Sequence, residues 1–257
     1  MNLERLWRNI DRQKLAYRKR LAPVFVKAFD VQIQPLYDKI MQASDIRDIE
    51  VPPLDNKAIE SAYERLYMIT AIDFAKNKRA GLRKFIALKD DDDLIVEDLI
   101  MEHIKAYLRQ NAGSTITAIG DTSKELLQDL LKQIVPEILD SGIGGGTAQT
   151  MLRDRIRSAW HEAKRYRTER IVRTEVNRAA NWGSLEGIKS VGVDMDKVWL
   201  SAFAKESRPE HMAANGQKVG LYDTFSVGGE NLQYPGDPAG SAANTINCLC
   251  SLFEQLK

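Results

Sequence analysis

The stretch Asp194–Phe203, with the sequence DMDKVWLSAF, marks the point at which the pattern of the chain changes. Its second part, Lys197–Phe203, is rich in branched and aromatic residues and predicts a β-strand. Before it, apolar residues recur every three or four positions, as on one face of a helix. After it, short strand-like runs alternate with glycine and proline turns. The sequence therefore predicts an α+β protein, with a mainly α-helical N-terminal region followed by a small mixed α+β C-terminal domain.

Two connectors divide the helical part of the 257-residue chain. Val51–Pro53 is stiff, because proline fixes its own backbone and disfavours helix at the residue before it. Ser141–Gly146 contains four glycines and predicts a hinge. The expected domains are an N-terminal helical arm over 1–50, a helical region over 51–146, and a C-terminal domain over 147–257 with helices at 147–190 and the α+β part at 191–257.

Further breaks are expected inside the helical part. Pro23 is predicted to separate two helices, Ala112–Asp121 to form a loop, and Pro136 to kink or shorten the end of a helix. The four aspartates Asp90–Asp93 lack the alternating ligands and central glycine of a calcium-binding loop. They predict the solvated start of a helix, where negative charge is favoured.

In the C-terminal domain, the sequence predicts two more strands and one tight turn. Thr224–Val227 precedes two glycines and is expected to be one arm of a turn, and Ile246–Phe253 is expected to be the last strand. Pro235–Pro238, with the sequence PGDP, predicts the tight turn.

Composition excludes several classes of protein. The 37 basic and 36 acidic residues give a net charge of +1, which argues against a protein that coats DNA. The charge is arranged in blocks, however: +6 over residues 1–27, −7 over 28–146, +5 over 147–178 and −3 over the remainder. No apolar run approaches the roughly 20 residues of a membrane-spanning helix, and the charged N-terminus is unlike a signal peptide. We therefore expect an intracellular protein.

The second basic block predicts an amphipathic helix. Leu152 and Ile156 share its apolar side with two alanines. The basic side consists of Arg153, Arg157, Lys164 and Arg167. This side is a candidate nucleic-acid-binding surface, because such residues neutralise phosphates without reading sequence. An ordinary solvated helix face has the same pattern, and the sequence leaves both interpretations open.

Glu175 is predicted to be a buried carboxylate, because it lies four residues from both Ile171 and Ala179 on the apolar side of a helix. Burial without a partner would cost several kcal/mol or force the group to hold a proton. The functional interpretation is a metal ligand or general base. We expect instead a structural ion pair, with Arg208 or Arg178 as the partner.

The two cysteines, Cys248 and Cys250, are one residue apart and cannot join distant segments. On a strand their sulfurs would point to the same face, which is half of a zinc site. His211 is the natural third ligand, with Asp237, Glu175 or a water as the fourth. The alternative is two small buried apolar residues beside a hydrogen-bonded histidine. No nucleophile is spaced to pair with the remaining histidines, so no catalytic residue is predicted.

Several short runs carry a resemblance to a known family. They are RTEVNRAANWG at 173–183, KVW at 197–199, RPEH at 208–211, NG at 215–216, FSV at 225–227, YPGDP at 234–238 and INCLC at 246–250. In their order and spacing they strongly resemble the C-terminal domain of the phage Mu F-like minor head proteins. The resemblance covers about residues 147–252. The helices before it resemble no family that we can name.

The resemblance implies a minor head protein of a tailed double-stranded-DNA phage or prophage that acts in head morphogenesis. It implies the portal protein and other head components as partners, possible contact with double-stranded DNA, no membrane, and a place in the head interior near the portal after assembly in the host cytoplasm. It also implies possible zinc binding at His211, Cys248 and Cys250. Three departures weaken that site: Leu249 replaces a common arginine, Asn215 a common aspartate, and no histidine lies just before Cys248.

The sequence thus favours a non-enzymatic head protein. The alternative is a metal-dependent hydrolase or nuclease-like domain that uses Glu175, His211, Cys248 and Cys250 around an ion. Catalytic zinc keeps three protein ligands and one open position, so three ligands are compatible with that chemistry.

Overall fold

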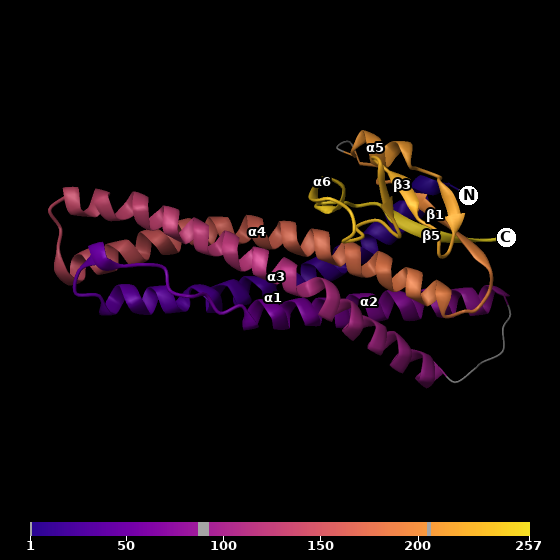
Figure 1. Cartoon of the computed structure of the whole chain (residues 1–257), viewed down its shortest axis with the longest axis horizontal. Helices are drawn as coiled ribbons and strands as arrows, with labels where there is room; N and C mark the ends of the chain where they lie inside the picture. The colour runs from indigo at the N-terminus through magenta and orange to yellow at the C-terminus, as the bar shows by residue number, and fades with distance from the viewer. Residues whose placement is uncertain (1, 87–92, 205–206) are drawn as a thin grey trace. The chain divides into compact units, whose positions relative to one another are not determined.

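The structure, a computed structural model, describes residues 2–86, 93–204 and 207–257 (Figure 1). The long helices are α1 (Leu3–Gln42), α2 (Lys57–Ile86), α3 (Asp93–Asp140) and α4 (Gly145–Lys189). The short helices are η1 (Ile46–Asp48), α5 (Pro209–Ala213) and α6 (Ala242–Thr245). The strands are β1 (Met195–Leu200), β2 (Lys218–Gly220), β3 (Phe225–Val227), β4 (Glu230–Leu232) and β5 (Ser251–Leu256). The predicted α+β class is confirmed. None of the helices in the described ranges is long and apolar enough to cross a membrane.

The chain forms two compact units, and each is assembled from separate segments of the sequence. The mixed unit consists of residues 1–21, 64–110 and 170–257, and the helical unit of residues 22–63 and 111–169. Consecutive domains over 1–50, 51–146 and 147–257 were expected. The observed units differ from these because each long helix contributes residues to both.

Helix α1 is continuous through the point at which Pro23 was expected to end it. Pro23 and Pro35 both lie inside the helix. The buried residues Leu21, Phe25 and Phe29 continue the helical spacing through Pro23. Most helical stability in proteins comes from packing an apolar face, and here that packing outweighs the unfavourable proline.

Helix α3 is likewise uninterrupted, so the predicted loop over Ala112–Asp121 was wrong. Ala112, Ile116 and Ile119 are buried at helical spacing within it. The small and β-branched residues of this segment are poor helix formers, but their apolar face is packed. The helix also passes Pro136 and ends one turn later at Asp140. Asp90–Asp92 lie outside the described residues, and α3 begins at Asp93.

Two antiparallel sheets form the strand part of the mixed unit. The first has the strand order β2-β1-β5, with Trp199 opposite Leu252, and the second pairs β3 with β4. The predicted tight turn is present at Pro235–Pro238, where the Asp237 N–H donates to the carbonyl of Tyr234 and Gly236 has φ 89°. The predicted last strand begins at Ser251 instead of Ile246.

The first turns of α1 complete the core of the strand part (Figure 1). Trp7 belongs to the same buried cluster as Trp199 and Phe225, and its indole Nε1 donates to the carbonyl oxygen of Leu249 at 2.9 Å. The cluster also contains both cysteines. The first turns of α1 are therefore part of this core.

Within the mixed unit, α4 approaches α2 closely at two glycines. A Cβ atom added at Gly183 would lie 2.2 Å from the backbone oxygen of Ala71, and one added at Gly187 would lie 2.4 Å from that of Ala75. These positions need glycine because any side chain would meet backbone atoms. Gly183 ends the RTEVNRAANWG run, so part of that motif serves helix packing.

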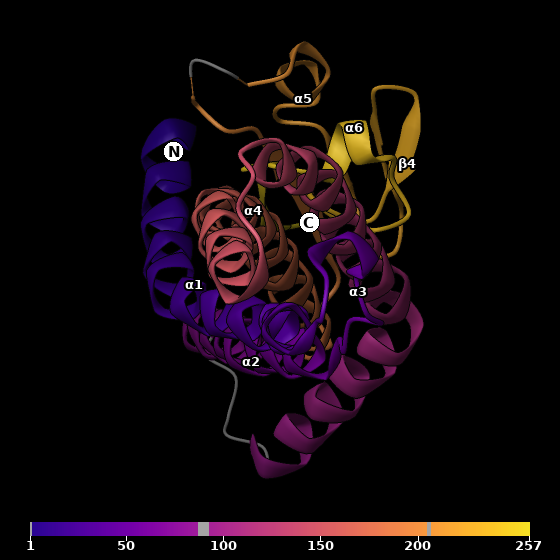
Figure 2. The same cartoon turned by 90° about the vertical axis from the view of Figure 1, so that its left-hand side faces the viewer.

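In the helical unit, the end of α1 and the start of α4 lie side by side (Figure 2). Phe29 of α1 meets Trp160 of α4 edge to face, with ring centroids 6.0 Å apart. A chain of polar side chains joins α3 to α1 and to the residue before α2. Ser123 of α3 donates to Gln32 of α1, and the amide of Gln32 donates to Asn56. This unit is therefore held by both aromatic and amide contacts.

Candidate functional site

Three of the sequence runs meet at one cavity of the mixed unit, with a volume of about 330 Å³. It is lined by Arg173 of α4, by Arg208 and His211 at α5, and by Asn247–Cys250, the loop before β5. The residues come from positions more than 30 apart in the chain, so the cavity exists only in the folded protein.

The structure brings together the three residues that were predicted as zinc ligands. The Nδ1 atom of His211 lies 3.3 Å from Sγ of Cys250 and 3.7 Å from Sγ of Cys248, and all three side chains are buried. Their ligand atoms all lie within 4.8 Å of one another. Tetrahedral zinc with bond lengths of about 2.3 Å to sulfur and about 2.0 Å to nitrogen places N and S about 3.5 Å apart. The two observed distances lie on either side of that value, so the residues present fit such an ion.

The proposed fourth ligands from the protein are elsewhere. Within the described part of the chain, the cluster contains neither Glu175 nor Asp237. The carboxylate of Asp237 accepts the N–H groups of Gln233 and Ala239 and thereby stabilises its own turn. Neither carboxylate is therefore positioned as a fourth ligand.

The two cysteines do not lie on a strand, as was predicted, because β5 begins after them. Hydrogen bonds from two other elements hold the loop instead. Arg208, at the start of α5, donates to the carbonyl of Ile246, and two residues of α1 donate to the next carbonyls, Trp7 to that of Leu249 and Lys14 to that of Cys250. The sulfurs converge because tertiary contacts fix this loop, not because of strand periodicity.

Helix α5 presents His211 to the sulfurs. Pro209 occupies the first turn of this helix, where a missing N–H costs nothing. The imidazole packs edge-on against Trp199, with ring centroids 5.7 Å apart. Its Nε2 atom is buried and has no hydrogen-bond partner among the described residues. The ring is thus fixed with Nδ1 directed at the two cysteines.

The pKa values of the two thiols move in opposite directions. A hydrogen bond from the Cys250 thiol and contact with His211 hold the pKa of Cys248 below its usual range. The same bond and burial raise the pKa of Cys250. Cys248 is therefore the sulfur that more readily becomes the thiolate, the form that binds metal.

Lys14 is a polar centre that the sequence analysis did not identify. Its Nζ atom is fully buried and lies within hydrogen-bond distance of four acceptors: Asn177 Oδ1 at 2.7 Å, Asn181 Oδ1 at 3.2 Å, the Cys250 carbonyl at 3.3 Å and Ser251 Oγ at 2.7 Å. Burial lowers its pKa to about 7. The available signal was a lysine four residues after Ile10 on an apolar helix face.

Glu175 forms the ion pair that was expected, and its partner is Arg178. Nη1 of Arg178 lies 2.9 and 3.1 Å from the two carboxylate oxygens, and the Tyr67 hydroxyl donates to one of them at 2.9 Å. Nε of Arg178 donates to the carbonyl of Gly236 at 2.7 Å. Arg208 is half-buried and uses one N–H on the Ile246 carbonyl, at 2.6 Å. The carboxylate is thus satisfied at a site separate from the cysteines.

The predicted basic side of α4 is divided in the helical unit. Lys164 is buried and ion-paired with Asp30, and the Arg167 guanidinium lies 4.9 Å from the centroid of the Phe29 ring. Burial lowers the pKa of Arg167 to about 10. Arg153 is half-buried, and Arg157 is exposed. Two of the four residues are therefore part of the packing between helices and not a free surface.

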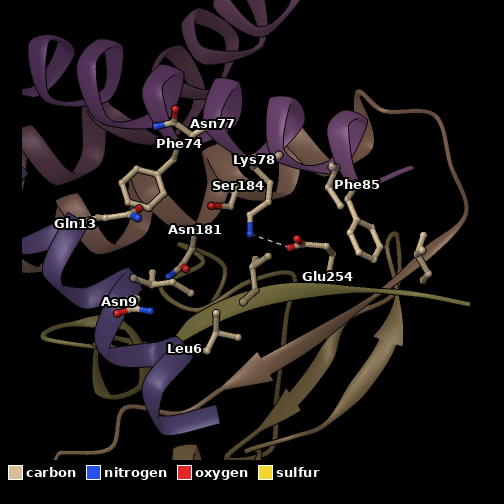
Figure 3. A pocket seen from close by; sticks show the side chains of 15 residues that line it. Leu6, Asn9, Gln13, Phe74, Asn77, Lys78, Phe85, Asn181, Ser184 and Glu254 are labelled. Carbon is tan, nitrogen blue, oxygen red and sulfur yellow. Dashed lines mark ion pairs between the residues drawn. The ribbon is translucent and has the colours of Figure 1, made fainter. Parts of the chain in front are cut away.

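A second and larger cavity of the mixed unit, of about 530 Å³, lies between α1, α2, α4 and β5 (Figure 3). Lys78 of α2 and Glu254 of β5 point toward one another there and form an ion pair at 2.8 Å. Amide side chains, the exposed ring of Phe85 and several other apolar side chains also line it. None of the predicted site residues lines this cavity.

Comparison with known proteins was consistent with the resemblance. Residues 132–253 match the model of the family described as phage Mu protein F like protein. The chain is also similar to the NAD(+)-arginine ADP-ribosyltransferase EFV of Enterococcus faecalis, with 29% identity over 96 residues, which are 36% of this chain and 20% of that protein. The chain thus spans about a fifth of the length of that relative. No solved structure matches. Residues 132–253 are therefore similar to the phage Mu protein F-like family, as the sequence runs indicated.

Proposed function

We propose that this protein is a non-enzymatic minor head protein of a tailed double-stranded-DNA phage or prophage and acts in head morphogenesis. The main support for the proposal is the family match over residues 132–253. The matched residues include the whole lining of the cavity, with its histidine and two cysteines. Most motif residues in this span are buried, and several bond to one another, as Arg178 does to Glu175 and Asn181 to the carbonyls of Pro235 and Cys250. The proposed location is the head interior near the portal.

The proposed partners are the portal protein, other head components and packaged DNA. The charge blocks along the chain favour contact with a polyanion by some segments and with basic protein surfaces by others. On α4, Arg157, Arg165 and Arg170 are exposed. These residues are better candidates for phosphate contact than Lys164 and Arg167, which are engaged inside the helical unit.

We further propose that His211, Cys248 and Cys250 hold a structural zinc ion. Such an ion would join α5 to the loop before β5, in addition to the hydrogen bond from Arg208 to the Ile246 carbonyl. The fit of the donor distances to tetrahedral geometry supports it. The chemistry that zinc supplies in such a site is the cross-linking of loops in a small domain.

An enzymatic role has less support. The hydrolase alternative used Glu175 as base, but Arg178 and Tyr67 already bind that carboxylate. The transferase activity in its name belongs to the whole Enterococcus protein. The segment similar to this chain makes up only one fifth of that protein. This activity is not carried over to this chain.

Deletion of the gene from the phage or prophage that encodes it tests the head role. We expect particles purified from the parent to contain the protein by mass spectrometry, and the deletion to reduce DNA-filled heads seen by electron microscopy. Supplying the gene from a plasmid should restore them. Normal filled heads without the gene, or its absence from parental particles, would refute the proposal.

Elemental analysis tests the zinc site. The purified wild-type chain should contain about one zinc per molecule, and the Cys248→Ser variant should lose it. The Ser226→Ala variant, which changes an exposed residue of the same unit, is the control. If the wild-type protein contains no zinc and the Cys248→Ser variant is equally stable, the three residues are ordinary core residues and the zinc proposal is wrong.

A further inference from the structure

We propose that the cavity beside His211, Cys248 and Cys250 binds a phosphate group, held by the guanidinium groups of Arg173 and Arg208. Phosphate binding at this place is independent of a role in a phage head. The ligand is defined by its chemistry, a dianionic tetrahedral oxyanion, and both free phosphate and the terminal phosphate of a nucleic-acid strand carry it.

Arg173 is the first observation. It lines the cavity from α4, is half-buried, and makes no hydrogen bond or ion pair with any described residue. Its Nε is completely buried without a partner. A guanidinium has five N–H donors in a fixed fork that matches phosphate, and an unpartnered buried donor is costly. The exposed part of the side chain, which lines the cavity, remains available to an anion.

Arg208 supplies the second guanidinium from a different element. One of its N–H groups holds the Ile246 carbonyl, which fixes the side chain at the cavity. Its remaining donors have no partner among the described residues. Two arginines brought together from α4 and from the start of α5 are typical of anion recognition, because each can donate twice to one phosphate.

The charge around the cavity is positive and poorly compensated. Its described lining contains two arginines and no carboxylate. Arg18, which pairs with Asp11 at 3.0 Å, lies near Arg173: burial lowers the pKa of Arg18, and the charge of Arg173 lowers it further. Like charges held together without an anion destabilise the fold. Two positive charges facing one cavity favour a dianion such as phosphate over a single carboxylate.

Size agrees with this ligand. A volume of about 330 Å³ is at the lower end of small-molecule sites and suits a phosphate with a small attached group.

Calorimetric titration of the purified full chain with inorganic phosphate, against sodium chloride and acetate at equal ionic strength, tests the site. We expect measurable binding of phosphate, weakened about tenfold or more by Arg173→Gln and by Arg208→Gln, since each removes hydrogen bonds to a charged group. Arg170→Gln, an exposed arginine one turn earlier on α4, is the matched control and should change affinity less than twofold.

Folding of the variants is checked separately. Arg173→Gln removes an unpartnered charge, so its melting temperature without phosphate should equal or exceed that of the wild type. A short oligonucleotide with a 5′-phosphate, compared with its 5′-hydroxyl form, distinguishes the two sources of the phosphate. Binding of inorganic phosphate or of the phosphorylated end supports the site. No binding of either, stronger binding of acetate, or equal weakening by Arg170→Gln would overturn it.

Discussion

The packing of α4 on α2 makes a sharp prediction for Gly183→Ala. An alanine Cβ at this position would lie 2.2 Å from the backbone oxygen of Ala71, whereas ordinary contact begins near 3.4 Å. The obstacle is backbone and not a flexible side chain, so the two helices must separate by about 1 Å. Overpacking of this kind costs about 1–3 kcal/mol. The higher helix propensity of alanine offsets about 1 kcal/mol of it at most.

Matched controls exist in the same protein. Gly81 in α2 and Gly113 in α3 are exposed helical glycines, and a Cβ at either has no atom within 4 Å. The same glycine-to-alanine change there should stabilise the chain by about 0.5–1 kcal/mol, because alanine loses less backbone entropy on folding. Gly187→Ala should behave like Gly183→Ala, since its Cβ would lie 2.4 Å from the oxygen of Ala75.

Urea unfolding monitored by circular dichroism compares the variants. We expect Gly183→Ala to lower the unfolding midpoint and Gly81→Ala to raise it, with equal slopes. In a thermal scan each kcal/mol corresponds to a shift of about 2–4 °C for a chain of this size. If Gly183→Ala is as stable as Gly81→Ala, the close approach of the helices is not a feature of the folded protein, and the reasoning fails.

Three other changes test buried and exposed charges. The folded pKa of Lys14 is about 7, below its ordinary 10.5, so between these values the unfolded chain binds more protons and stability should rise with pH. Lys14→Met should remove this rise, which is at most about 1.4 kcal/mol per pH unit. Urea unfolding at pH 7 and pH 9 measures the rise, and the same increase of stability with pH in the variant would contradict the prediction. Arg178→Met leaves the Glu175 carboxylate buried and unpaired and should cost about 3–5 kcal/mol, partly restored by Glu175→Gln in the same chain. A cost below 1 kcal/mol would exclude a buried pair. Lys78→Ala breaks the partly exposed ion pair with Glu254 and should lower the melting temperature by about 2 °C or less. The difference should vanish in high salt. A large decrease in melting temperature would show that solvent does not screen the pair.

Much of the candidate site could be predicted from the chain. His211 and the cysteines were correctly expected to converge, and Glu175 was correctly expected to need an arginine. These predictions depend on residue chemistry: a carboxylate on an apolar face requires a partner, and thiols with an imidazole in the same domain are natural neighbours. The reason given for the sulfurs was wrong, however, because the loop before β5 and not a strand places them.

Other features had no readable signal. Arg173 was one arginine among nine basic residues of its block, and nothing local separated it from exposed Arg170. The continuity of α1 through Pro23 and of α3 through residues 112–121 also contradicted local propensity. In both cases buried apolar side chains on neighbouring helices supplied the stabilisation, and no single segment contains that information.

By itself the sequence determined the α+β class, the change of pattern near residue 194 and the tight turn at Pro235–Pro238, because hydrophobic period and the backbone limits of proline and glycine are local properties. Only the tertiary structure decided which polar groups meet. Lys14 reaches Asn177, 163 residues later, and Trp7 completes a core formed by the last strands. Such pairings follow from the packing of whole helices, in which burial and mutual hydrogen bonding select among many partners of equal chemistry.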